Sequence, residues 1–486
     1  MAANPGGFWS IGTPAPGVYS VSQPLSIPVP ALNAFPPIQT RPLLAAVAAL
    51  LLCAGVRANC LDEDKLETLP AASSPAAAGA PAEPRRLLQQ LVGDALARNH
   101  GVGAARLLAE AAEQDVGEAE ANKKPQASLN ASVNPSLESA KGGSSSSLQA
   151  RAGISLSQTL YDGGRGDRLV DWRRGQAEAA RLGLLSTQEQ IALSTTSMAL
   201  ERSRFRMQAV IYGQNVRKMG CLVQALETIV AADKGRTSEL VQARKQLQQA
   251  ELQQVQAQSQ ARQVEARMRR VVGDGLPGTE GMATLLLAVP ELPAVLSAAE
   301  RSVDISQLAA NASALRQIAR VVEAGNKPQV SWNVGGSALV TSGGGVTLSS
   351  PRSASLSAGV TLSVPILNPS IEYSGQAARK RAEAADLQRA DALEQRRQRI
   401  VDVHEQAGNA FERLKRVGLV LRDSDRLRNF TLQQWQQMGR RSLFDVIASE
   451  SDHYNLRVQY VNALHDGQQM NATLTSLGTG LSAWLQ

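Results

Sequence analysis

The chain contains one pattern twice. The segment at 121–131, with the sequence ANKKPQASLNA, recurs at 324–334 as AGNKPQVSWNV, and six of the eleven positions are identical. A second segment at 152–157, AGISLS, recurs 206 residues later as AGVTLS. Internal repeats of this kind are the signature of one supersecondary unit that is used more than once. We therefore predict that the fold is a tandem duplication.

The duplication predicts the organisation of the whole chain. We expect, in order, a leader with a secretory signal at 1–58, an Ala/Pro-rich linker at 59–84, repeat 1 at 85–272, a linker at 273–290, repeat 2 at 291–478 and a tail at 479–486. Each repeat is expected to hold helices, then two strands, then a long helical hairpin. The strands are predicted at 126–134, 148–158, 329–340 and 353–364, and the helical hairpins at 165–272 and 370–478.

The four predicted strands alternate strictly between apolar and polar residues. In the first strand, Ala127, Leu129, Ala131 and Val133 alternate with Gln, Ser and Asn. In a single strand, this alternation would indicate a half-buried strand of a soluble sheet. Four together, each close to the ~9 to 11 residues that a tilted strand needs to cross a bilayer, favour a transmembrane barrel. Two hairpins would leave unpaired edges, so we expect partner chains to close the sheet, and three protomers would give twelve strands.

Two long stretches without proline, 165–276 and 370–486, follow the strands. The second has apolar residues at coiled-coil spacing: Leu393, Ile400, Ala407, Leu414 and Leu421, with Val403, Ala410 and Val417 between them. Single glycine-containing breaks at 234–236 and 439–441 are predicted to form the tips of helical hairpins. An arm from Arg165 to Ala232 would be ~100 Å long at 1.5 Å per residue, which is longer than compact domains use.

The N-terminal segment resembles a secretory leader. Arg41 precedes an apolar run at 43–56, and Val56-Arg57-Ala58 offers a small-x-small cleavage site. The run is short for a membrane-spanning helix. Cys60 follows the expected cleavage site, but Arg57 and Asn59 are unusual next to a lipidated cysteine, so we leave lipidation open.

Sequence motifs favour neither an enzyme nor a cofactor-binding or metal-binding protein. The pattern GxGxxG at 273–278 follows a helical stretch and includes Pro277, whereas a phosphate-binding loop joins a strand to a helix. The four histidines lack metal-ligand spacing. Nucleic acid is not an expected partner, because the leader would export the chain. Basic clusters at 165–174 and 379–399 fit solvated helix faces, or, as an alternative, contacts with anionic lipid head groups.

Four local motifs carry a resemblance to a known family. They are SQTLYDGG at 157–164 and SVPILN at 363–368 after the strands, and GRTSELVQA at 235–243 and GRRSLFDVIA at 439–448 at the hairpin tips. Their order and spacing resemble the TolC-like outer-membrane factor (outer membrane efflux protein) family, type I secretion subgroup. The resemblance implies an α+β membrane protein. It would be a homotrimeric outer-membrane β-barrel with four strands per protomer, continued by a long α-helical coiled-coil tunnel in the periplasm of a Gram-negative bacterium.

The resemblance also implies a gate at the periplasmic tips. By position, Arg441 would bridge to Ser238 and Glu239 across neighbouring tips, and Asp445 would contribute one carboxylate per subunit to a ring around the bore. The family prototype has a second acidic ring where this chain has Ala448. An equally good interpretation is that these are ordinary solvated charges beside helix turns.

The function that the resemblance implies is a passive exit duct of a type I (ABC-driven) protein secretion system, which would export a large RTX-type toxin. The implied partners are two further copies of the chain, a periplasmic adaptor (membrane fusion) protein that opens the tip, an inner-membrane ABC transporter, outer-membrane lipid and the transported cargo. One alternative is the outer-membrane component of a multidrug or metal efflux pump. An alternative of a different class is a periplasmic coiled-coil adaptor, although no lipoyl-like β halves flank the hairpins.

Overall fold

The computed structural model describes residues 82–140, 143–343, 352–435 and 441–486. The expected leader and Cys60 lie outside the described residues. The first half of the described chain contains α2 (Ala82–Arg98), α3 (His100–Ala121), β1 (Gln126–Ala140), β2 (Gly143–Tyr161), α4 (Arg165–Ala232), the 3-10 turn η1 (Lys234–Arg236) and α5 (Thr237–Val272).

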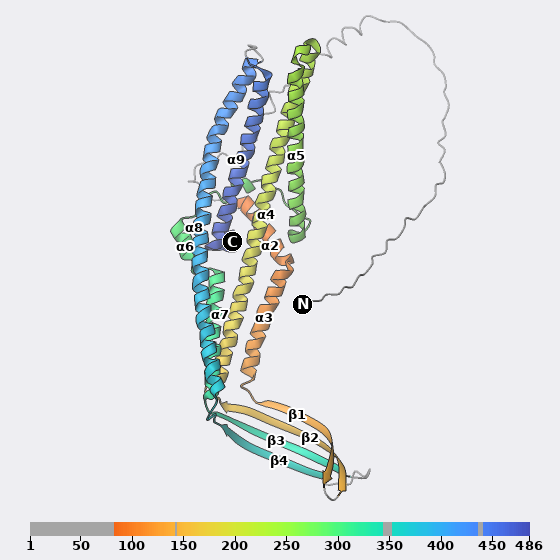
Figure 1. Cartoon of the computed structure of the whole chain (residues 1–486), viewed down its shortest axis with the longest axis vertical. Coiled ribbons are helices and arrows are strands. Elements are labelled where there is room, and N and C mark those ends of the chain that lie inside the picture. Colours follow the sequence, from red (N-terminus) through yellow and green to blue (C-terminus); the bar gives the residue numbers. More distant parts are fainter. Residues whose placement is uncertain (1–81, 141–142, 344–351, 436–440) are drawn as a thin grey trace, which may run out of the picture. The chain divides into compact units, whose positions relative to one another are not determined.

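The second half has a similar order of elements. It contains η2 (Met282–Thr284), α6 (Leu292–Ala299), α7 (Val303–Glu323), η3 (Ala324–Asn326), β3 (Gln329–Gly343), β4 (Arg352–Ser363), α8 (Pro369–Gln433), α9 (Leu443–Leu477) and α10 (Leu481–Leu485). In both halves a helix leads into two strands, which lead into a pair of long helices (Figure 1).

Helix boundaries follow local capping chemistry. The Asn99 side chain accepts hydrogen bonds from the backbone amides of Gly101 and Val102, which are among the donors left without a partner at the start of α3. At the start of α9, the Ser442 hydroxyl accepts in the same way from the Phe444 amide, at 3.1 Å. Gly273 ends α5 with φ 104°, a conformation that side chains with a Cβ rarely adopt.

The four strands form one antiparallel sheet in the order β1-β2-β3-β4. Its register aligns the alternating residues across the sheet: Ala131 lies opposite Ala152, Ala152 opposite Ala338 and Ala338 opposite Ala354. The apolar residues of all four strands therefore share one face, as the alternation predicts. The β1–β2 ladder continues to the Ala140–Gly143 pair, so both strands extend beyond the ends predicted at 134 and 148.

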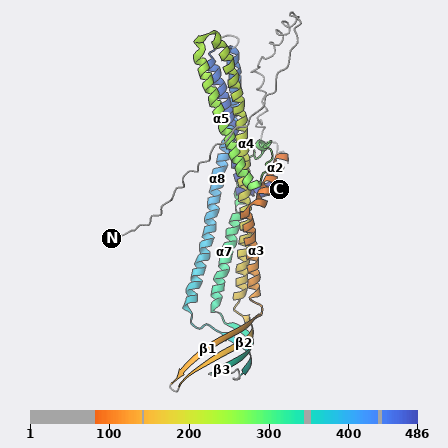
Figure 2. The same cartoon turned by 90° about the vertical axis from the view of Figure 1, so that its right-hand side faces the viewer.

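The long helices pack side by side, with α4 in contact with α3, α5, α7 and α9, and α8 in contact with α7 and α9. Figures 1 and 2 show that α3, α4, α7 and α8 run to the sheet, whereas the free ends of the α4–α5 and α8–α9 pairs lie away from it. The predicted seams are buried or half-buried. Ile400 and Ala407 of α8, and Ala243 and Val264 of α5, are fully inaccessible to water.

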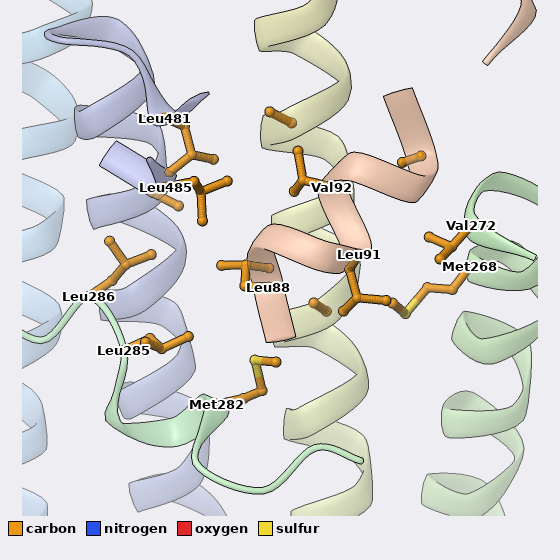
Figure 3. Close-up of a cluster of buried hydrophobic side chains, with 14 of the residues drawn as sticks. Leu88, Leu91, Val92, Met268, Val272, Met282, Leu285, Leu286, Leu481 and Leu485 are labelled. Atoms are coloured by element: carbon orange, nitrogen blue, oxygen red, sulfur yellow. The ribbon is translucent and has the colours of Figure 1, made fainter. Parts of the chain in front are cut away.

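The largest apolar core is built around α2. Figure 3 shows Leu88, Leu91 and Val92 of α2 between Met268 and Val272 on one side and Leu481 and Leu485 on the other. Met282, Leu285 and Leu286, from the segment predicted only as a linker at 273–290, are also part of this core. That segment is therefore a packed part of the structure and does more than join the repeats.

The same segment is held against α9 by two buried amide side chains. Gln468 Nε2 donates to the carbonyl oxygens of Met282 and Leu285, at 3.0 and 2.6 Å. Asn471 Nδ2 donates to the carbonyl oxygens of Leu286 and Ala288, at 2.7 and 3.1 Å. Because buried carbonyl groups need hydrogen-bond donors, these amides allow an irregular segment to lie inside the packed helices.

Candidate functional site

The tips of the two helical hairpins are joined by an apolar cluster. It contains Met219, Leu222, Val223 and Leu226 of α4, Leu240 and Ala243 of α5, Leu432 of α8, and Leu443, Val446 and Ile447 of α9. We call these residues the tip cluster. Each hairpin supplies part of it, so separating the α4–α5 tip from the α8–α9 tip would expose apolar surface to water.

Arg441 and Asp445, two of the predicted gate residues, are neighbours at the start of α9. Arg441 Nη1 lies 3.8 Å from Asp445 Oδ2, and both side chains are about half exposed. Arg441 Nε also donates to Gln434 Oε1, at 3.2 Å. Exposed ion pairs of this kind contribute ~0–1 kcal/mol. The pair is therefore weak enough to be exchanged for other partners.

Ser238 and Glu239, the other predicted gate residues, lie in the first turn of α5. Ser238 is exposed. Glu239 is half-buried, and its Oε2 atom is inaccessible to water with no hydrogen-bond partner among the described residues. Among the described residues, Arg441 contacts Asp445 and Gln434, and no hydrogen bond or ion pair joins it to Ser238 or Glu239. The bridge between neighbouring tips stays a prediction.

Behind the tip cluster lies a buried charged group that the sequence reasoning missed. The Glu450 carboxylate of α9 has no exposed surface, and its Oε1 lies 3.8 Å from Lys218 Nζ of α4. Its Oε2 lies 3.5 Å from Arg428 Nη1 of α8, and Arg428 Nη2 donates to Asp425 Oδ1 at 2.9 Å. One carboxylate thus joins three helices from both hairpins. One feature of the sequence could have identified this group. The charged Glu450 lies on the apolar stripe that Leu443, Ile447 and Tyr454 form along α9.

The apolar face of the sheet is uncovered in the protomer. Leu129, Val133, Leu356, Val360 and Leu362 are all exposed. The opposite face is hydroxyl-rich, with Ser128 Oγ 2.7 Å from Ser155 Oγ and Ser337 Oγ 2.9 Å from Ser355 Oγ. Such an exposed apolar face indicates contact with lipid or with protein, because soluble monomers rarely leave large apolar patches in water.

Comparisons with known proteins bear on this arrangement. Residues 91–274 match the family model described as outer membrane efflux protein. Structures of CusC superpose with a TM-score of 0.71 at 16% identity, covering 81% of this chain and 92% of that one. The chain has the fold of CusC.

Other solved structures have the same fold. VceC, an outer membrane protein from Vibrio cholerae, has a TM-score of 0.68 at 17% identity, covering 81% of this chain and 96% of that one. The CmeC outer membrane channel of Campylobacter jejuni has a TM-score of 0.68 at 14% identity, covering 81% of this chain and 86% of that one. Among curated proteins, no sequence matches the chain. These relatives are described as outer membrane proteins or channels, and none as an enzyme.

Within this outer membrane efflux protein fold, the two basic clusters are largely neutralised. Arg173 pairs with Asp115, Arg174 with Glu120, Arg379 with Glu323 and Arg397 with both Glu300 and Glu394. These pairs favour the interpretation as solvated helix faces over contacts with anionic lipid head groups.

The residues that the structure describes provide no group of three or more His, Cys, Asp or Glu side chains placed to hold a metal ion. Over the same residues, no helix is both long enough and apolar enough to cross a membrane. The GxGxxG pattern at 273–278 follows α5 and leads into an irregular segment, so it lacks the strand-to-helix context of a phosphate-binding loop.

Proposed function

We propose that the chain is one protomer of a trimeric outer-membrane channel, a passive duct of a tripartite export system in a Gram-negative bacterium. The observation that carries the proposal is a four-stranded sheet whose apolar residues share one exposed face and whose outer strands, β1 and β4, each pair with one neighbour. A two-faced sheet with free edges fits a bilayer when copies join edge to edge, because closure satisfies the edge hydrogen bonds.

The helices supply matching edges. α3 and α5 contact α4, whereas α8 contacts α7 and α9, so α3 and α5 lie at one side of the helices and α8 at the other. Exposed apolar residues occur at both sides. The first set is Leu107, Leu108, Val241, Leu252 and Val255, and the second is Leu387, Leu419, Val420, Leu427 and Phe430. Different surfaces at the two sides suit a head-to-tail contact, which generates a ring when the rotation closes. Three copies would give twelve strands and a helical tunnel.

A purified-protein experiment tests this proposal. Reconstitution into planar bilayers should give discrete conductance steps, and the unheated protein should migrate as a trimer that heat converts to the monomer. Replacing apolar edge residues by charge, as in Leu252→Glu with Phe430→Glu, should abolish the trimer. Arg416→Glu, an exposed change on α8, is the matched control and should leave it intact. A monomer in native membranes, with no conductance, would overturn the proposal.

Two cargo classes follow from the same architecture. The first is a large RTX-type toxin exported by a type I system with an ABC transporter and a periplasmic adaptor, and the sequence resemblance extends to the CyaE secretion protein of an adenylate cyclase-haemolysin toxin. The second is a drug or metal ion exported by an efflux pump, which the family description favours. Deleting the gene separates them: a protein missing from the medium supports secretion, and increased sensitivity to toxic small molecules supports efflux.

The gate belongs to this proposal. Arg441 of one tip would bridge to Ser238 and Glu239 of a neighbouring tip, and Asp445 would form a ring of carboxylates around the bore. The exposed positions of Arg441 and Ser238 support the bridge, because a neighbouring tip can reach both side chains. An adaptor that offers alternative partners would release the tips.

A further inference from the structure

An apolar pair of residues follows each hairpin of the sheet. Leu160-Tyr161 ends β2 in the first half, and Ile366-Leu367 follows β4 in the second half, 206 residues later. The exposed fractions of these side chains are 59% and 53% in the first pair and 95% and 86% in the second. We call the four residues the collar.

The collar continues the apolar face of the sheet. A register shift between Thr159 and Tyr161 places Tyr161 opposite Val330, and Val330 lies opposite Leu362. Val330 and Leu362 are part of the apolar face, so Tyr161 joins that face at its helix-side end. After β4, the exposed Val364 leads from Leu362 to the Ile366-Leu367 pair.

A charged layer begins directly beyond the collar. Asp162 accepts hydrogen bonds from the Gly164 and Gly166 amides at the start of α4, at 2.9 and 2.6 Å. Lys327 Nζ donates to the Gly163 carbonyl at 3.1 Å, and Lys123 pairs with Asp167. The side-chain hydrogen bond between Lys123 and Asp167, followed by their Coulomb attraction, raises the pKa of Lys123 and lowers that of Asp167. Both groups therefore stay charged and hydrated.

We propose that the collar inserts into the boundary between acyl chains and head groups of the periplasmic leaflet and sets the depth of the channel in the membrane. This proposal rests on the proposed function, and it identifies the lipid contact that fixes the position of the channel in the membrane. Exposed large apolar residues, three aliphatic and one a tyrosine, between an apolar face and a charged layer match the polarity gradient of a bilayer interface. The chain has few aromatic residues, 3%, and the collar would take the place that aromatic girdles have in other barrels.

A neighbouring copy of the chain could also cover the collar, but the order of the strands does not favour this contact. Ile366-Leu367 follows β4, an edge strand that a second copy would cover, but Leu160-Tyr161 ends β2, which has neighbours on both sides. A copy joined at the sheet edges would leave the β2 pair uncovered. The lipid, in contrast, surrounds a closed sheet on every strand and reaches both pairs.

Tryptophan reporters in vesicles of brominated lipids test the proposal, because bromine on an acyl chain quenches only indoles within contact distance. Three single variants are compared with the unmodified chain: Ile366→Trp in the collar, Leu356→Trp on the apolar face of β4 and Gln388→Trp on α8, outside the apolar edge set. All three positions are exposed in the protomer, so substitution leaves packing within the protomer intact. The signal of each reporter is its fluorescence minus that of the unmodified protein in the same lipid.

We expect the Ile366→Trp reporter to lose fluorescence in brominated lipid, more with bromines near the head group than with bromines near the chain end. The Leu356→Trp reporter should be quenched by deeper bromines, and the Gln388→Trp reporter should keep its fluorescence. Quenching of the Leu356→Trp reporter without quenching of the Ile366→Trp reporter would overturn the collar while leaving the channel proposal intact. Absence of quenching at both sites would overturn the channel itself. Quenching of the Gln388→Trp reporter would overturn the collar by placing the membrane boundary beyond it.

Discussion

Lys218 of α4 and Glu450 of α9 meet in the interior of the protein, with Nζ 3.8 Å from Oε1 and both side chains almost fully shielded from water. Arg428 of α8 approaches the other oxygen of the same carboxylate, at 3.5 Å. The contact lies next to the tip cluster and joins the two helical hairpins. Any opening movement that separates the hairpins at their tips therefore acts on this buried group as well as on the exposed Arg441 contacts.

Removing the buried carboxylate should destabilise the protein strongly. Glu450→Ala leaves Lys218 and Arg428 in the interior without it, and loss of one partner of a buried ion pair costs about 3–5 kcal/mol. We expect a clearly lower midpoint in urea unfolding followed by circular dichroism. Arg441→Ala removes an exposed pair and is the control, with an expected change below about 1 kcal/mol. Equal effects of the two variants would show that Glu450 has no special structural role.

The same carboxylate should also influence opening. Glu450→Gln retains the shape but removes the charge, so it should weaken the attachment of α9 to α4 and α8 near the tip. In planar bilayers we expect a larger fraction of time in high-conductance states than in the unmodified channel. Conductance that matches the unmodified channel would confine Glu450 to a structural role.

The proposed gate bridge predicts a similar result from exposed positions. Arg441→Ala and Glu239→Ala should each raise the conductance, because charge-assisted hydrogen bonds of ~1 kcal/mol per subunit would be lost at the mouth. Arg426→Ala on α8, an exposed arginine paired with Asp423, should leave the conductance unchanged. Unaltered conductance in both gate variants would remove the bridge from the account.

Asp445 should control ion preference at the tip. Its side chain is about half exposed, and three copies around a narrow bore would attract cations. Asp445→Asn should shift the reversal potential in a salt gradient towards lower cation preference, more at low salt because ions screen the ring. A reversal potential that does not move at any salt concentration would show that these carboxylates do not line the permeation path.

Stability should fall in acid because of one buried histidine. Burial is the main reason that the pKa of His465 is lowered from 6.5 to about 4. The nearby Arg204 also lowers this pKa, whereas the hydrogen bond with the Val461 carbonyl and the charge of Asp466 raise it. The unfolded state therefore binds the proton first as the pH falls below 6.5. The free energy of unfolding should be unaffected by this group above pH 6.5 and should drop by about 3 kcal/mol as the pH approaches 4.

Urea unfolding of His465→Gln across this pH range checks the assignment. The variant should lose the part of the acid sensitivity that lies between pH 6.5 and 4. His100→Gln, at the exposed start of α3, should retain the pH dependence of the unmodified chain. A pH profile that is the same in both variants would assign the sensitivity to other groups.

The sequence predicted the features that depend on periodicity. Alternation placed Leu129, Leu356 and Val360 on one face of a sheet, and heptad spacing placed Ile400 and Ala407 on a buried seam, because both patterns follow from backbone geometry. The strand ends were less predictable. The β1–β2 ladder runs to Ala140 and Gly143, because backbone hydrogen bonds continue through Ser-rich segments that have no apolar alternation.

Contacts between distant segments were beyond sequence reasoning. The local sequence pattern does not indicate that Gln468 and Asn471 hold the 282–288 segment, or that Glu450 contacts cationic side chains of two other helices. These contacts form only when packing sets the rotation of each helix about its axis. At the tip, Arg441 contacts Gln434 and Asp445 of its own hairpin. Its predicted partners, Ser238 and Glu239, are not among these contacts, and the bridge stays a prediction.

The mass of the intact complex tests the central claim most directly. The protein should be extracted unheated from outer membranes in mild detergent and measured by native mass spectrometry after detergent removal. The account predicts a complex of three chains, since three four-stranded sheets would close a barrel with no free edge. A single chain in that fraction, or recovery of the protein only from the soluble periplasm, would contradict it.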